Sequence, residues 1–336
     1  MKRSAAFLPV LLLMPLLLLL ALCFGCEAGQ REKFTLPEAP PPLPQPGDGY
    51  ITTLYYPDEE WRILIPLQRE LAETGTAVRS TLEQLTAAPQ RQKELASLGL
   101  TPLLPAGTEI LGIHIDGLGP ARVDFSSSFL EYDPHCERLV LGGLFCTLRQ
   151  FPEVERLEIM VEGNIPERFP GETPGGLPLG PECFVNLEVD DALEDYQKYT
   201  AVTVYFCFPT PPGRILYVPV TRALPPVEER AAAALQELLA GPRRGSPLFS
   251  DIVPGTALRS LQIEEGLAVV DLSEKLLDYE GGRTGAENMV NQLLLTLGRL
   301  EDVERVQILV EGEQVELPEE IDLTVSLEPP AVYNFY

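Results

Sequence analysis

Repeated carboxylates are the residues of this chain best suited to acid–base chemistry. Asp124 and Asp271 stand in the matching phrases VDFS and VDLS, and Glu162 and Glu311 stand in two copies of VEG. A pair of carboxyl groups can cleave a glycosidic bond of peptidoglycan, one as the acid and the other as base or nucleophile. Each of the four, however, is also typical of a strand end before a turn, and no aromatic-lined sugar groove accompanies them. We therefore predict that the chain has no catalytic residues and is not an enzyme.

Metal and nucleophile chemistry has fewer candidates still. The chain contains 2 histidines. His114 matches an ordinary strand position in the second half of the chain, and His135 lies in a loop of the first half. A zinc site needs three or four ligands, and neither histidine has partners at such spacing. Since a nucleophile elbow and a phosphate-binding loop are also missing, we predict no metal, no cofactor and no small-molecule substrate.

One cysteine is predicted to carry a lipid. Basic residues precede an apolar run from Ala5 to Phe24, which Gly25 and Cys26 follow. Residues 1–25 resemble a bacterial lipoprotein signal peptide, whose removal leaves Cys26 as the lipidated (palmitate-bearing) N-terminus. The alternative is an uncleaved anchor, because about 20 apolar residues can cross a bilayer. Either arrangement exports the rest of the chain and tethers it to the outer face of the cytoplasmic membrane.

The other cysteines of the exported part have no repeated positions. Export would permit disulfides between them, and the sequence alone cannot choose a pairing. Because none recurs at the matching position of the other half, we expect small hydrophobic side chains rather than a disulfide framework. The four are Cys136, Cys146, Cys183 and Cys207.

The net charge of −25, from 25 basic and 50 acidic residues, limits the classes of molecule that the chain can bind. Such a chain cannot neutralise phosphates over a nucleic-acid surface, so nucleic acid is excluded as a partner. Anionic lipid headgroups would repel it as well, whereas a basic protein partner would be attracted. The proline-rich residues 26–49 are expected to form a semi-rigid spacer between the anchor and the first folded domain.

A duplication organises the rest of the chain. The phrases RILIPLQREL, LLPAGTEIL and VERLEIMVEG return as RILYVPVTRAL, DIVPGTALR and VERVQILVEG. The repeated units span residues 50–165 and 201–316. Residues 166–200 are a linker and residues 317–336 a tail, and each is expected to hold an extra strand, the linker's joining the sheet of the first copy. We expect the copies to fold independently.

Periodicity predicts the elements that position these residues. Apolar and polar residues alternate in 203–208, which indicates a strand, and apolar residues recur at helical spacing in 287–300. Pro219 disfavours a central, fully paired position for its strand. Ser126 and Ser273 are expected to cap the helical turns that follow them. Each copy then reads β-β-α-β-β-α-β, an α+β domain with a mixed or antiparallel sheet and two helices on one face.

These motifs resemble a known family. Two tandem copies with VPVTR, LLAGP, IVPGT, AVVDLS and VERVQILVEG, behind a lipoprotein signal, are similar to the GerM sporulation and germination lipoproteins. The resemblance covers residues 50–165 and 201–316, and the second copy is closer than the first. It implies a lipoprotein between the mother-cell and forespore membranes, supporting assembly of the complex that joins the two cells. The implied partners are proteins of that sporulation membrane complex, ring-forming ones included.

The sequence therefore predicts a non-catalytic, lipid-anchored assembly protein on the extracytoplasmic face of the cell membrane. The alternative is an exported cell-envelope module that recognises a wall or peptide ligand outside sporulation. A pocket lined by aromatic residues would favour the alternative, and the candidates for its lining are Tyr55, Tyr56, Tyr205 and Phe206.

Overall fold

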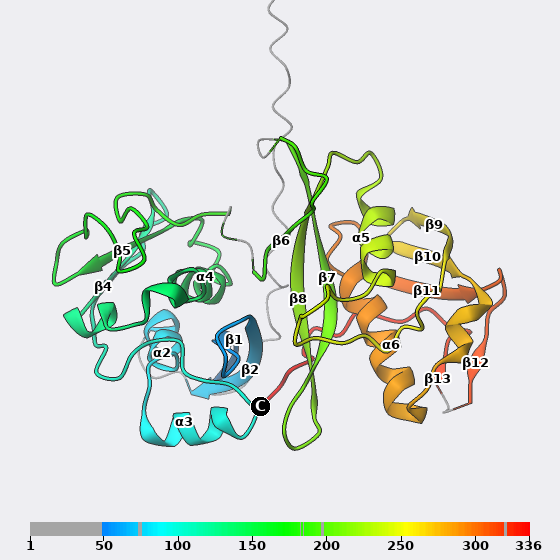
Figure 1. The fold of residues 1–336 in the computed structure, drawn as a ribbon, viewed down its shortest axis with the longest axis horizontal. Helices are drawn as coiled ribbons and strands as arrows, with labels where there is room; N and C mark the ends of the chain where they lie inside the picture. The colour runs from blue at the N-terminus through cyan, green and yellow to red at the C-terminus, as the bar shows by residue number, and fades with distance from the viewer. Residues whose placement is uncertain (1–48, 73–75, 182, 184, 196–197, 319–320) are drawn as a thin grey trace, which may run out of the picture. The chain divides into compact units, whose positions relative to one another are not determined.

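The computed structural model describes residues 49–72, 76–181, 183, 185–195, 198–318 and 321–336 (Figure 1). The expected signal peptide, Cys26 and the proline-rich spacer lie outside the described residues, so the predictions about them stay predictions. Both copies of the repeat belong to one compact unit.

The first copy contains two hairpin strands, helices and a small sheet in the expected order. Its elements are β1 (Gly49–Pro57), β2 (Leu64–Ala72), α2 (Ala77–Glu83), α3 (Pro89–Ala96), β3 (Ile110–His114), β4 (Ala121–Phe125), the 3-10 helices η1 (Ser127–Leu130) and η2 (Pro134–Cys136), α4 (Glu137–Leu148) and β5 (Leu157–Val161).

The second copy repeats this order without a counterpart of α3. Its elements are β7 (Thr200–Pro209), β8 (Ile215–Leu224), α5 (Arg230–Leu239), β9 (Leu258–Glu264), β10 (Leu267–Leu272), the 3-10 helix η3 (Glu274–Asp278), α6 (Gly282–Leu297) and β11 (Arg305–Val310); β6 (Glu188–Val189) precedes it, and β12 (Glu316–Leu317) and β13 (Ile321–Asp322) follow. The predicted α+β class and the tandem repeat are confirmed.

The strands of each copy divide between two sheets rather than one. In each copy the first two strands form an antiparallel hairpin, β1 with β2 and β7 with β8. The remaining three form a separate sheet with one antiparallel and one parallel pair, in the orders β3-β4-β5 and β9-β10-β11. In the second copy α5, which follows the hairpin in the chain, contacts both β7 of the hairpin and β9 of the small sheet.

Helices cover the hairpins because their apolar residues recur every three or four positions. In α6, Met289, Leu293 and Leu297 are fully buried, and α6 and α5 both pack against β7 (Figure 1). In the first copy α4 takes the same place against β1. The helices also occupy the outer hairpin edges: the N–H of Tyr55 donates to the Thr147 hydroxyl (3.2 Å), and that of Tyr205 donates to Thr296 (3.1 Å).

Of the extra strands expected after the two copies, the linker's joins the opposite copy, whereas the tail strand β13 pairs with β12 beside its own copy. The linker strand β6 pairs in parallel with β8 of the second copy, Glu188 opposite Arg222. The prediction that it extends the first copy's sheet is therefore wrong. The end of the C-terminal tail, which follows the second copy, reaches the first copy. There Phe335 forms a parallel bridge with Gln68 of β2. Each hairpin is thus bonded by the other copy's C-terminal extension, β8 through the short strand β6 and β2 through the single bridge of Phe335.

This exchange explains how Pro219 is accommodated. β8 lies in the middle of the order β6-β8-β7, where proline is normally avoided because it lacks an N–H donor. However, β6 is opposite only Arg222 and Ala223. At Pro219 the neighbour is instead the side chain of Asn186, which donates to the Pro219 carbonyl (2.9 Å).

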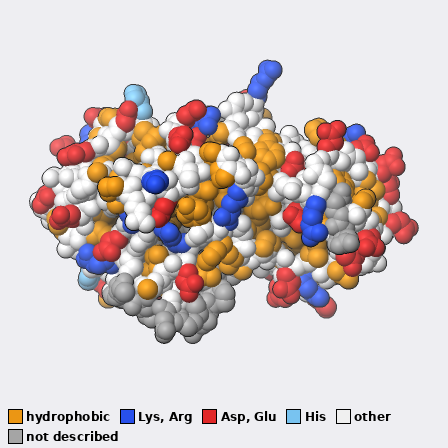
Figure 2. Space-filling model, turned by 90° about the horizontal axis from the view of Figure 1, so that it is seen from below, with side chains coloured by type: hydrophobic (Ala, Val, Ile, Leu, Met, Phe, Trp, Pro, Cys, Tyr) orange, Lys and Arg blue, Asp and Glu red, His pale blue; other side chains and the backbone are white. Residues whose placement is uncertain are grey.

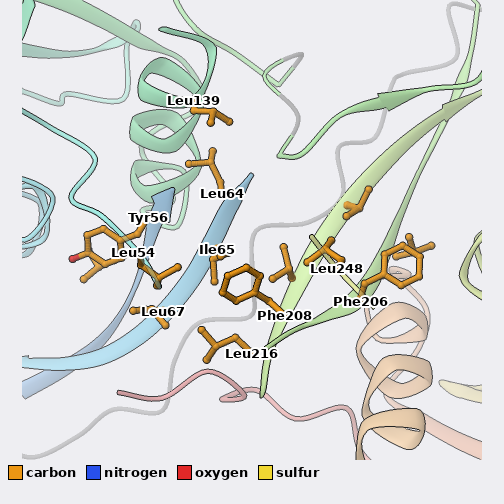
Figure 3. Close-up of a cluster of buried hydrophobic side chains, with 14 of the residues drawn as sticks. Leu54, Tyr56, Leu64, Ile65, Leu67, Leu139, Phe206, Phe208, Leu216 and Leu248 are labelled. Atoms are coloured by element: carbon orange, nitrogen blue, oxygen red, sulfur yellow. The ribbon is translucent and has the colours of Figure 1, made fainter. Parts of the chain in front are cut away.

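The copies share a hydrophobic core. One cluster of buried side chains contains Ile65 and Leu67 of β2 together with Phe208 of β7 and Leu216 of β8 (Figure 3). Burial of this kind stabilises by about 25 cal/mol per Å² of apolar surface, and either copy alone would expose it to water. The expectation that the copies fold independently is therefore not supported, and a single cooperative unit is expected instead.

Candidate functional site

The repeated carboxylates hold turns together in both copies. The Asp124 carboxylate accepts from the N–H of Gly163 (3.0 Å), and Asp271 accepts from Gly312 (2.8 Å). These glycines and the preceding Glu162 and Glu311 have positive φ angles, between 51° and 83°. Such a left-handed turn directs backbone N–H groups to one side, and a carboxylate is their natural acceptor.

The glutamates of these turns cap the 3-10 helices. Glu162 accepts from the first N–H of η1, at Ser127 (2.9 Å), and Glu311 accepts from that of η3, at Glu274 (3.1 Å). The same residue types therefore recur because two copies of one turn need them. All four repeated carboxylates are engaged with backbone N–H groups, an arrangement that accounts for them without acid–base chemistry.

The expected capping role of the serines is wrong. Ser126 and Ser273 stand at the N-cap positions of η1 and η3, but neither side chain bonds to its helix. Their hydroxyls instead accept from backbone N–H groups earlier in the chain, those of Glu109 (3.0 Å) and Ala257 (2.9 Å). Both donors directly precede the edge strand of their small sheet. The glutamate from the distant turn already satisfies the first helical N–H, which leaves the serine hydroxyl available for the strand.

Two asparagines join the copies in matching ways. Asn186, from the linker, accepts from the N–H of Leu64 (2.8 Å) and donates to the carbonyls of Leu64 (2.7 Å) and Pro219 (2.9 Å). Asn334, from the tail, accepts from the N–H of Tyr217 (2.8 Å) and donates to the carbonyls of Tyr217 (2.8 Å) and Pro66 (2.7 Å).

This asparagine clasp, defined as Asn186 and Asn334 with their partners, has an internal two-fold relation. Each asparagine bonds to a hairpin strand of its own copy and to the proline carbonyl of the opposite hairpin. Asn334 is fully buried, and the adjacent Gln68 is 1% exposed; Gln68 accepts from the N–H of Tyr333 (2.9 Å) and donates to the Ala331 carbonyl (3.1 Å). Buried polar groups that are all bonded specify one arrangement of the parts they join.

The aromatic residues proposed as a ligand pocket do not form one of useful size. Tyr55 and Tyr205 line the same cavity, with Tyr333 of the tail, but its volume is ≈ 30 Å³. That is room for about one water molecule, whereas small-molecule sites start at roughly 300 Å³. Tyr56 is buried elsewhere, its hydroxyl donating to the Gln84 carbonyl (2.8 Å), and Phe206 is fully buried.

Comparison with known proteins identifies the family to which both repeated domains belong. The family model described as Germane, sporulation and spore germination, matches residues 53–166 and 203–316. This chain belongs to the Germane family. The spore germination protein GerM of Bacillus subtilis (strain 168) is 27% identical over 248 residues, which are 72% of this chain and 67% of that protein.

A solved structure of the family has the same tandem arrangement. The tandem GerMN domains of the sporulation protein GerM from Bacillus subtilis match with a TM-score of 0.69 at 25% identity, over 84% of this chain and 99% of that one. The GerM-family resemblance read from the motifs is thereby confirmed.

The histidines of this Germane-family chain lie apart from one another and on the surface. His114 ends β3 beside Asp116 (3.2 Å), and His135 lies in η2. Within the described ranges, no group of three or more His, Cys, Asp or Glu residues could hold a metal ion. Over the same ranges, no helix is both long enough and apolar enough to cross a bilayer.

The cysteines Cys136, Cys146, Cys183 and Cys207 are thiols rather than disulfide partners. Cys146 and Cys207 are 5% and 0% exposed, inside α4 and β7. Burial raises the pKa of the Cys146 thiol to about 12, and burial also raises the pKa of Cys207. These thiols fill the core as the sequence predicted for small hydrophobic residues.

Alkylation should therefore separate buried from surface thiols. At pH 8 a thiol of pKa 12 is ionised to roughly one part in 10⁴, against about a quarter for an ordinary thiol. We expect iodoacetamide to leave Cys146 and Cys207 unmodified in the folded protein and to modify both in urea, as read by peptide mass mapping. Cys136, which is only half-buried in η2, is the internal control; burial and then Asp133 raise the pKa of its thiol as well, so it should react more slowly than an ordinary thiol but faster than the buried pair. Modification of Cys207 in the folded protein as fast as that of Cys136 would contradict the structure.

Proposed function

We propose that this protein is a non-catalytic, membrane-anchored lipoprotein that supports assembly of the complex between mother cell and forespore during sporulation and spore germination. The observation that carries the proposal is the match of both copies to a family described by sporulation and spore germination. The repeated carboxylates bond to backbone N–H groups of turns, which gives these four residues a structural role rather than a catalytic one.

The partners are proteins of the sporulation membrane complex, and the charge supports a basic one. On the face shown in Figure 2, carboxylates are scattered among polar and hydrophobic side chains. The net charge of −25 repels a second copy of the chain, over about 10 Å at 0.1 M salt, and draws a basic partner in. We expect the exported part to be mostly monomeric by itself.

The test is direct binding of the exported part to candidate components of the complex across a salt series. We expect capture of at least one component, with affinity that falls as salt rises, and light scattering that shows the larger assembly. Peptidoglycan is the comparison ligand, because the alternative function is recognition of the cell wall. Tight binding or cleavage of peptidoglycan, with no binding to any component, would overturn the proposal.

The anchor is tested at Cys26. In the proposed lipoprotein, replacement of Cys26 by serine removes the thiol that accepts the lipid, so the variant should keep its signal segment and lack a diacylglyceryl group. Mass spectrometry of the native protein should place that lipid on Cys26. A lipid on Cys23, or a membrane-bound native chain with its N-terminus intact, would favour the uncleaved anchor instead.

A further inference from the structure

A groove of ≈ 330 Å³ lies where the linker between the copies passes both of them. Four arginines line it: Arg62 before β2, Arg138 in the first turn of α4, and Arg243 and Arg244 in the loop after α5. The carboxylate in the lining is Glu188 of β6. This local excess of positive charge is the reverse of the whole chain, in which acidic residues outnumber basic ones 50 to 25.

Carboxylates of the protein neutralise only part of the positive charge of these arginines. Arg62 is paired with Asp58 (2.8 Å) and Glu60 (3.1 Å). Arg243 reaches Glu188 (3.3 Å), but Glu188 also pairs with the buried Arg222 (2.8 Å), so one carboxylate serves two cations.

The other two arginines have no such partner. Arg138 and Arg244 are exposed, and among the described residues neither makes an ion pair or a side-chain hydrogen bond. Arg138 also stands at the positive end of the dipole of α4, where a cation is disfavoured. An anion in the groove would give both arginines an ion-pair partner and would offset the unfavourable position of Arg138 at the helix N-terminus.

The chemistry of the lining indicates the class of anion. The planar guanidinium group presents paired N–H donors that match the oxygens of a phosphate group. The apolar part of the lining consists of Ile63, Leu187, Val220 and Leu248. A volume of ≈ 330 Å³ suits a small ligand, since sites for small molecules start at roughly 300 Å³.

A flat anionic membrane fits less well than a small anion. The remaining surface of the protein, with its net charge of −25, would be repelled by such a membrane. A small anion inside the groove would lie among the arginines that line it, and salt screens such short-range attraction less than attraction beyond about 10 Å at 0.1 M salt. We propose that the arginine groove binds a small phosphate ester of the diphosphate class.

The test is titration of the full chain in detergent with inorganic pyrophosphate as the probe, followed by calorimetry. We expect saturable binding that weakens with salt. Arg138→Gln and Arg244→Gln together should raise the dissociation constant at least about ten-fold, because each removes a charge-assisted hydrogen bond. The matched control is Arg305→Gln, an exposed arginine in β11 that lies outside the groove; it should leave the dissociation constant unchanged.

Further arms separate the sources of phosphate. Inorganic phosphate should bind more weakly than pyrophosphate. The protein should bind vesicles of anionic phospholipid more weakly than it binds either of these two ions. Absence of pyrophosphate binding, binding unaffected by the double variant, or groove-dependent binding to vesicles alone would each overturn the proposal. Because the variants lie on the surface, a matching melting temperature of variant and native protein confirms that the fold is intact.

Discussion

Replacement of Arg222 by alanine is expected to lower the free energy of unfolding by about 3 kcal/mol or more. The Arg222 side chain is 3% exposed and pairs with Glu188 (2.8 Å) and Glu237 (2.9 Å). It also donates to the carbonyls of Glu237 (2.7 Å) and Gly241 (2.8 Å) and lies over the ring of Phe206. The variant leaves the Glu237 carboxylate and two carbonyls without their donor, and Glu188 keeps only Arg243 as a cationic partner. Urea unfolding followed by circular dichroism measures the change.

The repeat supplies the matched control. Arg69 occupies the corresponding place in the first hairpin, but its side chain is 26% exposed and reaches Glu94 only at 3.8 Å. Partly exposed pairs with such long separations contribute up to about 1 kcal/mol, so Arg69→Ala should cost much less than Arg222→Ala. Equal losses for the two variants would show that the buried pairs of Arg222 add nothing to stability.

Replacement of Asn334 by alanine is expected to cost about 3 kcal/mol and to weaken both copies together. Three backbone groups, the N–H and carbonyl of Tyr217 and the carbonyl of Pro66, lose their partner in a fully buried place. Each unsatisfied buried group costs about 1–3 kcal/mol, and partial entry of water reduces the sum. Differential scanning calorimetry should show one transition, shifted to lower temperature as a whole.

Two further variants test the expected effect of Asn334→Ala, one as a matched change and one as a control. Asn186→Ala removes the other half of the asparagine clasp and should destabilise comparably, whereas Asn164→Ala removes an exposed local hydrogen bond to Glu162 and should change stability by less than about 0.5 kcal/mol. Separate melting of the two copies in Asn334→Ala would contradict the shared core, and would restore the view that each copy folds independently.

Local patterns in the sequence were sufficient for the elements and the duplication. Alternation in 203–208 predicts β7, and helical spacing in 287–300 predicts most of α6, because burial on one face depends on periods within a single segment. The repeated VEG motifs likewise predicted turns after these strands, since their glycines, Gly163 and Gly312, adopt positive φ angles readily. The family and fold class followed from these features.

The residues that join the copies could not be recognised in the same way. Asn186 and Asn334 do occur at matching places in the phrases VNLEV and YNFY, a signal that comparison of the two C-terminal extensions could have found. Their partners, however, are backbone groups of β2 and β8, and any residue has an N–H and a carbonyl. The burial of Arg222 in β8, in contrast to the partial exposure of Arg69 in β2, likewise could not be read from two similar sequence motifs.

The sequence by itself determined the repeat, the order of its strands and helices, and the residues that its turns need, because these depend on neighbours along the chain. Only the tertiary structure decided which hairpin each extension joins, that the serines bond to strands, and that four arginines line one groove in an acidic protein. These features depend on contacts between distant segments, where the identity of one partner places little constraint on that of the other.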